Sequence, residues 1–352
     1  MIKRTLPLLA SLVLASCSID STAPSDFSPD PLETLSAAER ESYLQAASEL
    51  FDGANIVGEP SLVECTLSEG AKTTCFSITV KPEPTNYTPG PWCPRNISDG
   101  PDKSGIWLNE GKVYDADGKF IADLKNFYKD DKWQMYDVST GKINVTDTKE
   151  KCAAAARPDV DEKYQNHCVE CRLDYMPESS SVTYVIPLRP VAANASSRAR
   201  GGAGVAINGV RLDGPAPTDA ILAAHTLAPF DDCGGHVNLH VGYHYHAVTD
   251  CLVDKSSKVS NNSDAPVIGL AMDGYKILAH KLSNGNSPAS LDSCQGHSTA
   301  EFGYHYHAGA AGSNQILGCL TAQQGCSFEG GAQSCDATVR RGPPGGGGPP
   351  PG

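Results

Sequence analysis

The chain has 352 residues and a formal net charge of −13. This length suffices for one large domain or two ordinary ones with a sizeable core. The acidic balance, with no basic run beyond the extreme N-terminus, argues against nucleic acid or an anionic membrane surface as a partner. Many turn-forming residues, with 34 Gly and 25 Pro, and few strong helical runs predict a mainly β, loop-rich fold. The sequence identifies no protein partner.

The first residues, "MIKRTLPLLASLVLASCS", have the plan of an export signal. Lys3 and Arg4 precede an apolar stretch that is too short to span a bilayer. Small residues then lead to Cys17, which resembles a bacterial lipobox whose cysteine is lipidated. We therefore predict a signal peptide over 1–16, a lipid anchor at Cys17 and a polar tether over 17–33. Ser18 favours an outer-membrane lipoprotein facing the periplasm or the cell surface; an ordinary secretory signal is the alternative.

The cysteines predict disulfides. Of 13 cysteines, Cys17 is set aside for lipidation, and the remaining even number in an exported chain is typical of a disulfide framework. Short spacings predict the local pairs Cys65–Cys75 and Cys326–Cys335. The CxxC of Cys168 and Cys171 is expected to form structural disulfides, with a redox or metal role as the alternative.

Residues 34–180 are expected to form an N-terminal β-rich lobe with one helix. Ser36 and Glu39 make a capping box at the start of "SAAERESYLQAASELF", which predicts that helix. Asp117-Gly118 lies between two alternating runs and predicts a hairpin. "TKEKCAAAARP" predicts a short helix, and "SVTYVIPL" predicts a strand.

Residues 181–325 contain an internal duplication, with copies at about 203–252 and 268–320. "GVAINGVRL" in the first copy corresponds to "GLAMDGYKI" in the second, and Asn-Gly or Asp-Gly in each predicts a two-residue hairpin. Both copies continue with Cys, Gly-His, Gly-Tyr-His-Tyr-His-Ala and Cys-Leu in the same order. We expect the halves to pack with pseudo-twofold symmetry. Residues 326–352 are expected to form a disulfide loop and a disordered Pro/Gly tail.

The simplest symmetric cysteine pairing is Cys233–Cys251 and Cys294–Cys319; a pairing swapped across the copies is the alternative. Each bridge would close a loop around one Tyr-His-Tyr-His segment. A loop of this length contributes about 3 kcal/mol in the chain-entropy model.

The two Tyr-His-Tyr-His segments, the "CGGH" and "CQGH" that precede them, and "INGV" and "MDGY" together resemble the YHYH-domain family. The resemblance covers about 180–325 strongly and reaches back to about 75 through weaker similarity. It implies an exported protein and no particular catalytic mechanism.

As a β-strand, each Tyr-His-Tyr-His segment places its histidines on one face and its tyrosines on the other. Two imidazoles about 6.6–7 Å apart on one face can lean onto a single ion. A third histidine lies eight residues before the first of each pair. The predicted metal ligands are therefore His236, His244 and His246 in the first set, and His297, His305 and His307 in the second.

His240 in the first copy aligns with Glu301 in the second, and both share strand parity with the histidine pair. Either residue could add a further ligand. Whether the sets form two sites or share one is open. Neutral imidazoles suit zinc, copper and nickel, and an oxidising exterior favours copper or zinc as the cofactor.

Three functions are consistent with these residues. The first is an extracytoplasmic metal-binding lipoprotein that uses the duplicated His-x7-His-x-His sets for storage, delivery or sensing. The second is a zinc hydrolase or lyase with three histidine ligands, in which Asp232 or Glu301 would assist as base. The third is a structural or adhesive disulfide-rich module without metal, its imidazoles bonded to main-chain carbonyls.

Overall fold

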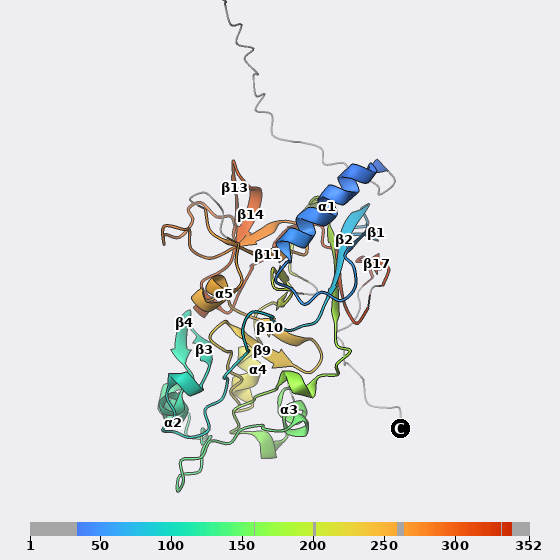
Figure 1. The fold of residues 1–352 in the computed structure, drawn as a ribbon. Helices are drawn as coiled ribbons and strands as arrows, with labels where there is room; N and C mark the ends of the chain where they lie inside the picture. Colours follow the sequence, from blue (N-terminus) through green and yellow to red (C-terminus); the bar gives the residue numbers. More distant parts are fainter. Residues whose placement is uncertain (1–33, 158, 200–201, 259–263, 332, 340–352) are drawn as a thin grey trace, which may run out of the picture.

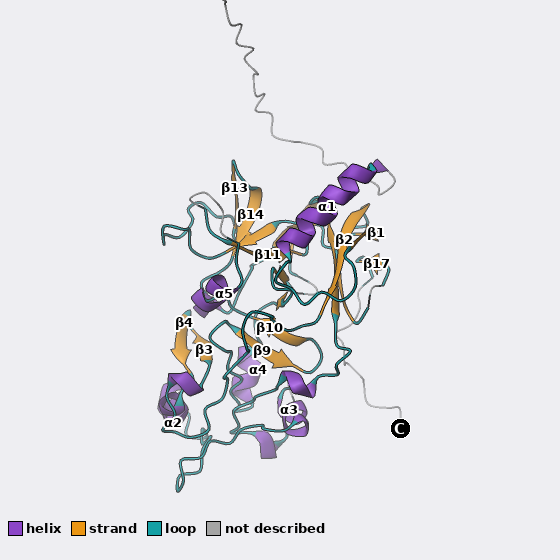
Figure 2. Cartoon of the chain, viewed as in Figure 1, coloured by secondary structure: helices purple, strands orange, loops and turns teal. Residues whose placement is uncertain are grey.

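The computed structural model describes residues 34–157, 159–199, 202–258, 264–331 and 333–339 (Figure 1). The predicted signal peptide, the lipidation site Cys17, the tether over 17–33 and the tail over 340–352 lie outside the described residues. None of the described helices combines the length and the apolar character needed to cross a membrane. The fold is mainly β, as predicted. The α-helices within these residues are α1 (Ala37–Leu50), α2 (Gly118–Phe127), α3 (Lys149–Ala155), α4 (Thr218–Ala223) and α5 (Asp250–Lys255) (Figure 2).

Helix α1 begins where the sequence predicts it. The Ser36 side chain accepts from the main-chain N–H of Glu39, and the Glu39 carboxylate accepts from the main-chain N–H of Ser36 at 2.8 Å, which completes the capping box. Leu44, Ala47 and Leu50 pack against the main core, and Phe51 is fully buried. The helix is therefore held to the sheets along one face.

A five-stranded sheet lies beneath α1 (Figure 1). Its central strands β2 and β5 are almost entirely buried, which agrees with the apolar run that predicts β5. Strands far apart in the chain share this sheet, in the order β16 (Cys326–Glu329), β5 (Val182–Pro187), β2 (Lys72–Val80), β1 (Ser61–Thr66) and β17 (Cys335–Asp336).

An eight-stranded sheet carries both Tyr-His-Tyr-His segments. Its order is β13 (Gly296–Thr299), β14 (Gly303–His307), β12 (Lys276–Leu278), β11 (Val267–Ala271), β7 (Gly204–Ala206), β8 (Arg211–Leu212), β10 (Gly242–Tyr245) and β9 (Gly235–Asn238).

The pairings on the two sides of the central β7–β11 contact correspond. β7–β8 and β11–β12 are hairpins, β10 and β14 run parallel to β8 and β12, and β9 and β13 close each end antiparallel. Figure 1 shows hairpins β9–β10 and β13–β14 on opposite sides of β11. The duplication remains a prediction, but the two halves have the same sequence of strand pairings.

A smaller lobe has its own core around Trp107, and its strands β3 (Ile106–Asn109) and β4 (Lys112–Asp115) lie beside the β9–β10 hairpin in Figure 1. These two strands form a hairpin. A separate two-stranded sheet is formed by β6 (Ala192–Ser197) and β15 (Leu320–Ala322). The predicted hairpin at Asp117-Gly118 is wrong. Asp117 instead caps α2 by accepting from the Phe120 N–H at 2.8 Å, and Gly118 packs so closely on Ile97 that a Cβ would lie 2.5 Å from its main chain. The turn that joins the strands is at Gly111, whose φ is +78°.

Candidate metal centres

Each end of the eight-stranded sheet is a hairpin that brings two histidines side by side. In β9–β10, His236 is directly opposite His244, and in β13–β14, His297 is directly opposite His305. Cross-strand neighbours have Cβ atoms about 4.5–5.5 Å apart, so their side chains meet on one face of the sheet. The third histidine, two residues further along, reaches the same face.

The rings of each set form similar triangles. The ring centroids of His236, His244 and His246 are 4.8, 4.8 and 5.0 Å apart. Those of His297, His305 and His307 are 4.7, 5.0 and 5.1 Å apart. Within each set, the donor atoms all lie within 4.8 Å of one another. The two sets are separate groups, one at each end of the sheet.

In the second set the Nε2 atoms converge closely. The Nε2–Nε2 distances are 3.0 Å from His297 to His305, 3.3 Å from His305 to His307 and 3.1 Å from His307 to His297. Ligand nitrogens at about 2.0–2.1 Å from a tetrahedral ion are roughly 3.3–3.4 Å from each other. The set therefore has nearly the spacing that one bound ion requires.

Main-chain carbonyls hold the other nitrogen of these rings. The Nδ1–H of His305 donates to Gly303 at 3.0 Å and that of His307 donates to Ala279 at 2.9 Å. His297 Nδ1 is 3.3 Å from the carbonyl of Ala289. A carbonyl only accepts, so the proton must be on Nδ1 and the Nε2 lone pair must point inward.

The first set is held in the same way. The Nδ1–H of His244 donates to Gly242 at 3.0 Å, and that of His246 donates to Gly214 at 2.6 Å. His236 hydrogen-bonds to the main chain at Ala228. The carbonyl contacts predicted for a metal-free module are thus present. In His244 and His246, however, the contact occupies Nδ1 and leaves Nε2 to face the other rings. This is the usual outer support of a metal-bound histidine.

Burial favours the neutral imidazole by lowering the pKa of five of these histidines, namely His236, His244, His246, His305 and His307. His244, His246, His305 and His307 are at most 6% exposed. Burial, followed by the neighbouring imidazoles, lowers the pKa of His236 and His244 well below the usual value. Burial likewise lowers the pKa of His307 to about 4. Neutral imidazoles are the form that binds metal.

The second set has a fourth donor that the sequence did not reveal. The Asp264 carboxylate oxygens lie 3.6 Å from Nε2 of His305 and of His307, and the residue is 7% exposed. Asp264 precedes β11 and has no fixed spacing from any histidine motif, so no sequence signal could have identified it. Together the four residues form a donor set of three imidazole nitrogens and one carboxylate oxygen.

The residues predicted as extra ligands do not join either set. His240 and Glu301 are exposed and lie in the turns between the hairpin strands, at 239–241 and 300–302. The alternation of side chains along a strand therefore does not apply to these two residues, because β9 ends at Asn238 and β13 ends at Thr299. Asp232, a predicted base, is also exposed and belongs to neither set.

The tyrosines on the reverse face anchor the same strands. Tyr243 donates to Asp231 at 2.7 Å, and Tyr304 donates to Asp292 at 2.6 Å. Asp231 and Asp292 also accept main-chain N–H groups of the Cys-Gly-Gly-His and Cys-Gln-Gly-His turns, from Cys233, Gly235, Cys294 and Gly296. Each aspartate therefore joins the turn that precedes the first histidine to the strand that carries the other two.

The second tyrosine of each segment reaches the hairpin of its own half. Asn208 donates to the Tyr245 hydroxyl at 2.9 Å, and Tyr306 donates to Asp273 at 2.6 Å. Burial raises the pKa of Asp273 to about 6. Asn208 and Asp273, which the sequence predicts only as turn residues, therefore also hold the tyrosine hydroxyls in place.

The glycine before the first histidine of each set has a steric reason. A Cβ on Gly235 would lie 2.4 Å from the Tyr243 ring, and one on Gly296 would lie 2.1 Å from the Tyr304 hydroxyl. Each tyrosine crosses over its glycine to reach the aspartate. Only glycine leaves room for the tyrosine side chain at the position before the histidine.

All twelve cysteines in the described residues are paired. The predicted Cys233–Cys251, Cys294–Cys319, Cys65–Cys75 and Cys326–Cys335 bonds are present. Cys168 and Cys171 are in structural disulfides, as expected, but their partners are the distant Cys93 and Cys152. No thiol of the described chain is left to bind metal.

A cavity of about 400 Å³ opens beside the first set, and His236, His244 and His246 are among its lining residues. Its walls come from the smaller lobe, the end of α3 and α4. Phe230 packs on the rings of His236 and His246, with centroids 4.8 and 5.5 Å away. The first set is therefore buried in the sheet on one side and faces a chamber on the other.

No curated protein and no solved structure matches this chain. Residues 183–290 match the family model described as YHYH protein. The match includes the first Tyr-His-Tyr-His segment and Asp264, and it ends before the second histidine set. The family that the sequence resembles is thus the one whose model matches residues 183–290.

Proposed function

We propose that this protein is an extracytoplasmic metal-binding lipoprotein that holds one copper or zinc ion on each histidine set. The observation that carries the proposal is the convergence of three Nε2 lone pairs at 3.0–3.3 Å in the second set, with every Nδ1 turned toward a carbonyl. Three acceptors at this distance repel one another. A cation between them turns the repulsion into coordination.

The choice of metal rests on the donors. Imidazole suits zinc and copper, and zinc accepts both histidine nitrogens and a carboxylate oxygen in a tetrahedral site. Cysteine does not compete, because the described thiols are in disulfides. Six disulfides also support an oxidising compartment, and with the lipobox at Cys17 we propose an outer-membrane anchor.

Elemental analysis of the full chain, purified and then loaded with zinc or copper, tests this proposal. We expect two equivalents of metal in the native protein. The variants His244→Ala/His246→Ala and His305→Ala/His307→Ala should each retain one equivalent, which also shows that they are folded. His240→Ala, in an exposed turn, is the matched control and should retain both.

Metal content that is unchanged in both double variants would refute the proposal. So would a native chain that binds no copper or zinc at micromolar concentrations while its circular dichroism shows it folded. A loss in only one double variant would reduce the proposal to a single site.

A zinc hydrolase or lyase is a second candidate, favoured by the chamber beside the first set. Three histidines with an exchangeable fourth position are the donor set of catalytic zinc. Ester hydrolysis or carbon dioxide hydration by the zinc-loaded chain tests it. The activity should vanish in His244→Ala/His246→Ala and persist in His305→Ala/His307→Ala, and any other pattern contradicts it.

A further inference from the structure

The two histidine sets differ in what completes their coordination. The second set has Asp264 as a fourth donor, and its rings His305 and His307 are fully buried. The first set consists of three histidines, with no fourth His, Cys, Asp or Glu donor joining them from the part of the chain that is described. A tetrahedral ion there would need a ligand from outside the protein.

The chamber beside the first set is suited to admit such a ligand. Its volume of about 400 Å³ is in the range of small-molecule sites. Much of its wall is apolar, with Trp92, Val169, Ile221, Ala228 and Val237 among the lining residues. A ligand that fills this space therefore gains by burying an apolar body against these side chains.

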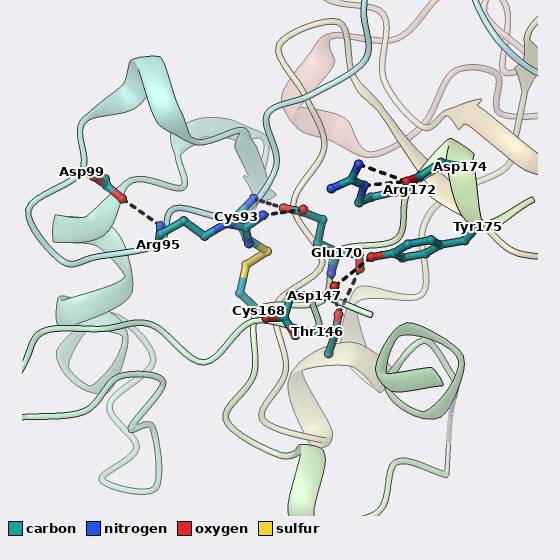
Figure 3. A network of polar contacts seen from close by, with 10 residues as sticks. All are labelled: Cys93, Arg95, Asp99, Thr146, Asp147, Cys168, Glu170, Arg172, Asp174 and Tyr175. Atoms are coloured by element: carbon teal, nitrogen blue, oxygen red, sulfur yellow. Dashed lines mark hydrogen bonds and ion pairs between the residues drawn. A yellow bond between two sulfur atoms is a disulfide. The ribbon is translucent and has the colours of Figure 1, made fainter. Parts of the chain in front are cut away.

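The charged residues around the chamber neutralise one another. Glu170 accepts from Arg95 at 2.6 Å beside the Cys93–Cys168 disulfide, as Figure 3 shows. The carboxylate is further held by the main-chain N–H of Cys93. The ion pairs at the chamber are Arg95–Glu170, Arg157–Asp159 and Arg211–Asp213.

An ion on the first set would therefore bring a charge that no carboxylate ligand of the described chain offsets, and the nearby Asp213, which acts on His236 and His246, is paired with Arg211. Three neutral imidazoles leave a divalent cation with its full double charge, whereas Asp264 removes one unit from the second set. In apolar surroundings such a charge strongly favours an anionic donor. The charge of the ion and the apolar wall together specify the ligand. It should offer an anionic oxygen to the metal and an apolar body to the wall.

We propose that the ion on the first set binds a small carboxylate with an apolar body, and that the second set is a closed structural site. The inference rests on the proposed metal binding. It assigns different tasks to two sets whose histidines have the same geometry.

Cobalt(II) absorption of the full chain tests the inference. Cobalt stoichiometry is measured first, and benzoate, acetate and the uncharged benzamide are then titrated in turn. We expect benzoate to change the visible bands saturably at one equivalent per chain. Acetate should require at least about tenfold higher concentration because it lacks the apolar body, and benzamide should leave the bands unchanged.

Variants locate the effect. The benzoate response should persist in His305→Ala/His307→Ala and disappear in His244→Ala/His246→Ala. Ala220→Trp, on the chamber wall, should weaken benzoate binding without reducing cobalt content. Ala223→Trp is the matched control, because it is exposed on the same helix and is not a lining residue.

A chain that binds two cobalt ions but whose bands ignore benzoate overturns the inference and leaves the metal-binding proposal intact. A response that survives the loss of His244 and His246 also overturns it. If cobalt, zinc and copper all fail to bind, the proposed function itself fails, and the inference falls with it.

Discussion

The Asp264 carboxylate lies 3.6 Å from Nε2 of His307, across a gap that an ion coordinated by both would span. A neutral amide in its place keeps the size of the side chain but is a weaker donor. We predict that Asp264→Asn lowers zinc affinity at the second set by at least about tenfold and leaves the first set unchanged. Competition titration with a chromogenic chelator measures both affinities. Glu301→Gln is the control, and equal affinities in Asp264→Asn and the native chain would show that Asp264 is not a ligand.

Metal removal is predicted to lower thermal stability. An ion that binds only the folded chain stabilises it by about 2.7 kcal/mol when its free concentration is 100 times Kd. Calorimetry with and without a strong chelator should therefore show a lower Tm in the chelator. His305→Ala/His307→Ala should show a smaller chelator effect than the native chain. An unchanged Tm in the native chain would favour the metal-free structural module.

Asp273 should make stability depend on pH. Its pKa of about 6 in the fold lies above the ordinary 3.8, because the carboxyl is buried. Between these values the folded chain keeps a proton on Asp273 that the unfolded chain has lost, so the contribution of Asp273 to stability falls as pH rises from about 4 to 6 and then levels off. A shift of this size corresponds to a loss on the order of 3 kcal/mol.

Asp273→Asn tests that dependence, because asparagine occupies the equivalent position in the first half as Asn208. Urea unfolding in chelator, at pH values from 4 to 7, should show the variant gaining stability relative to the native chain as pH rises to about 6, since the buried histidines affect both chains equally. Asp219→Asn, at an exposed position of α4, should keep the native slope. A variant slope equal to the native one would show that Asp273 is ionised throughout.

The paired tyrosines should contribute unequally. Tyr243 is fully buried and donates to a buried Asp231, whereas Tyr304 is only partly buried and Asp292 is more accessible. Removing a donor from a buried carboxylate costs about 1–3 kcal/mol. Tyr243→Phe should therefore lower the free energy of unfolding by this amount and Tyr304→Phe by less. Equal losses in urea unfolding would indicate that burial does not decide the strength of the bond.

Much of the local structure was predictable. The capping box of Ser36 and Glu39 and the buried strand over Val182–Pro187 depend on neighbouring residues alone. The hairpin at Asn208-Gly209 is also present, but its loop has three residues, 207–209, and not the predicted two, because Gly209 alone takes a positive φ. Prediction failed at Asp117, where a turn dipeptide caps a helix instead, because Gly118 packs against Ile97. A dipeptide specifies a bend, but packing decides whether a strand or a helix comes after it.

The candidate sites were partly predictable for the same reason. Strand alternation alone places His244 and His246 on one face, and the matched spacing points to His236 as their neighbour. Parity failed for His240 because the strands end in a turn before reaching it. Side chains alternate between the two faces only as far as the strand extends, and the sequence pattern did not show that β9 ends at Asn238.

The sequence by itself determined the repeated hairpins, the six converging imidazoles and the four local disulfides, because strand alternation and short loops depend on residues close in the chain. Tertiary structure alone decided the fourth donor Asp264, the chamber beside the first set and the long-range pair Cys93–Cys168, 75 residues apart. These depend on which distant segments pack together. That packing is set by the burial of whole sheet faces, so no spacing along the chain encodes it.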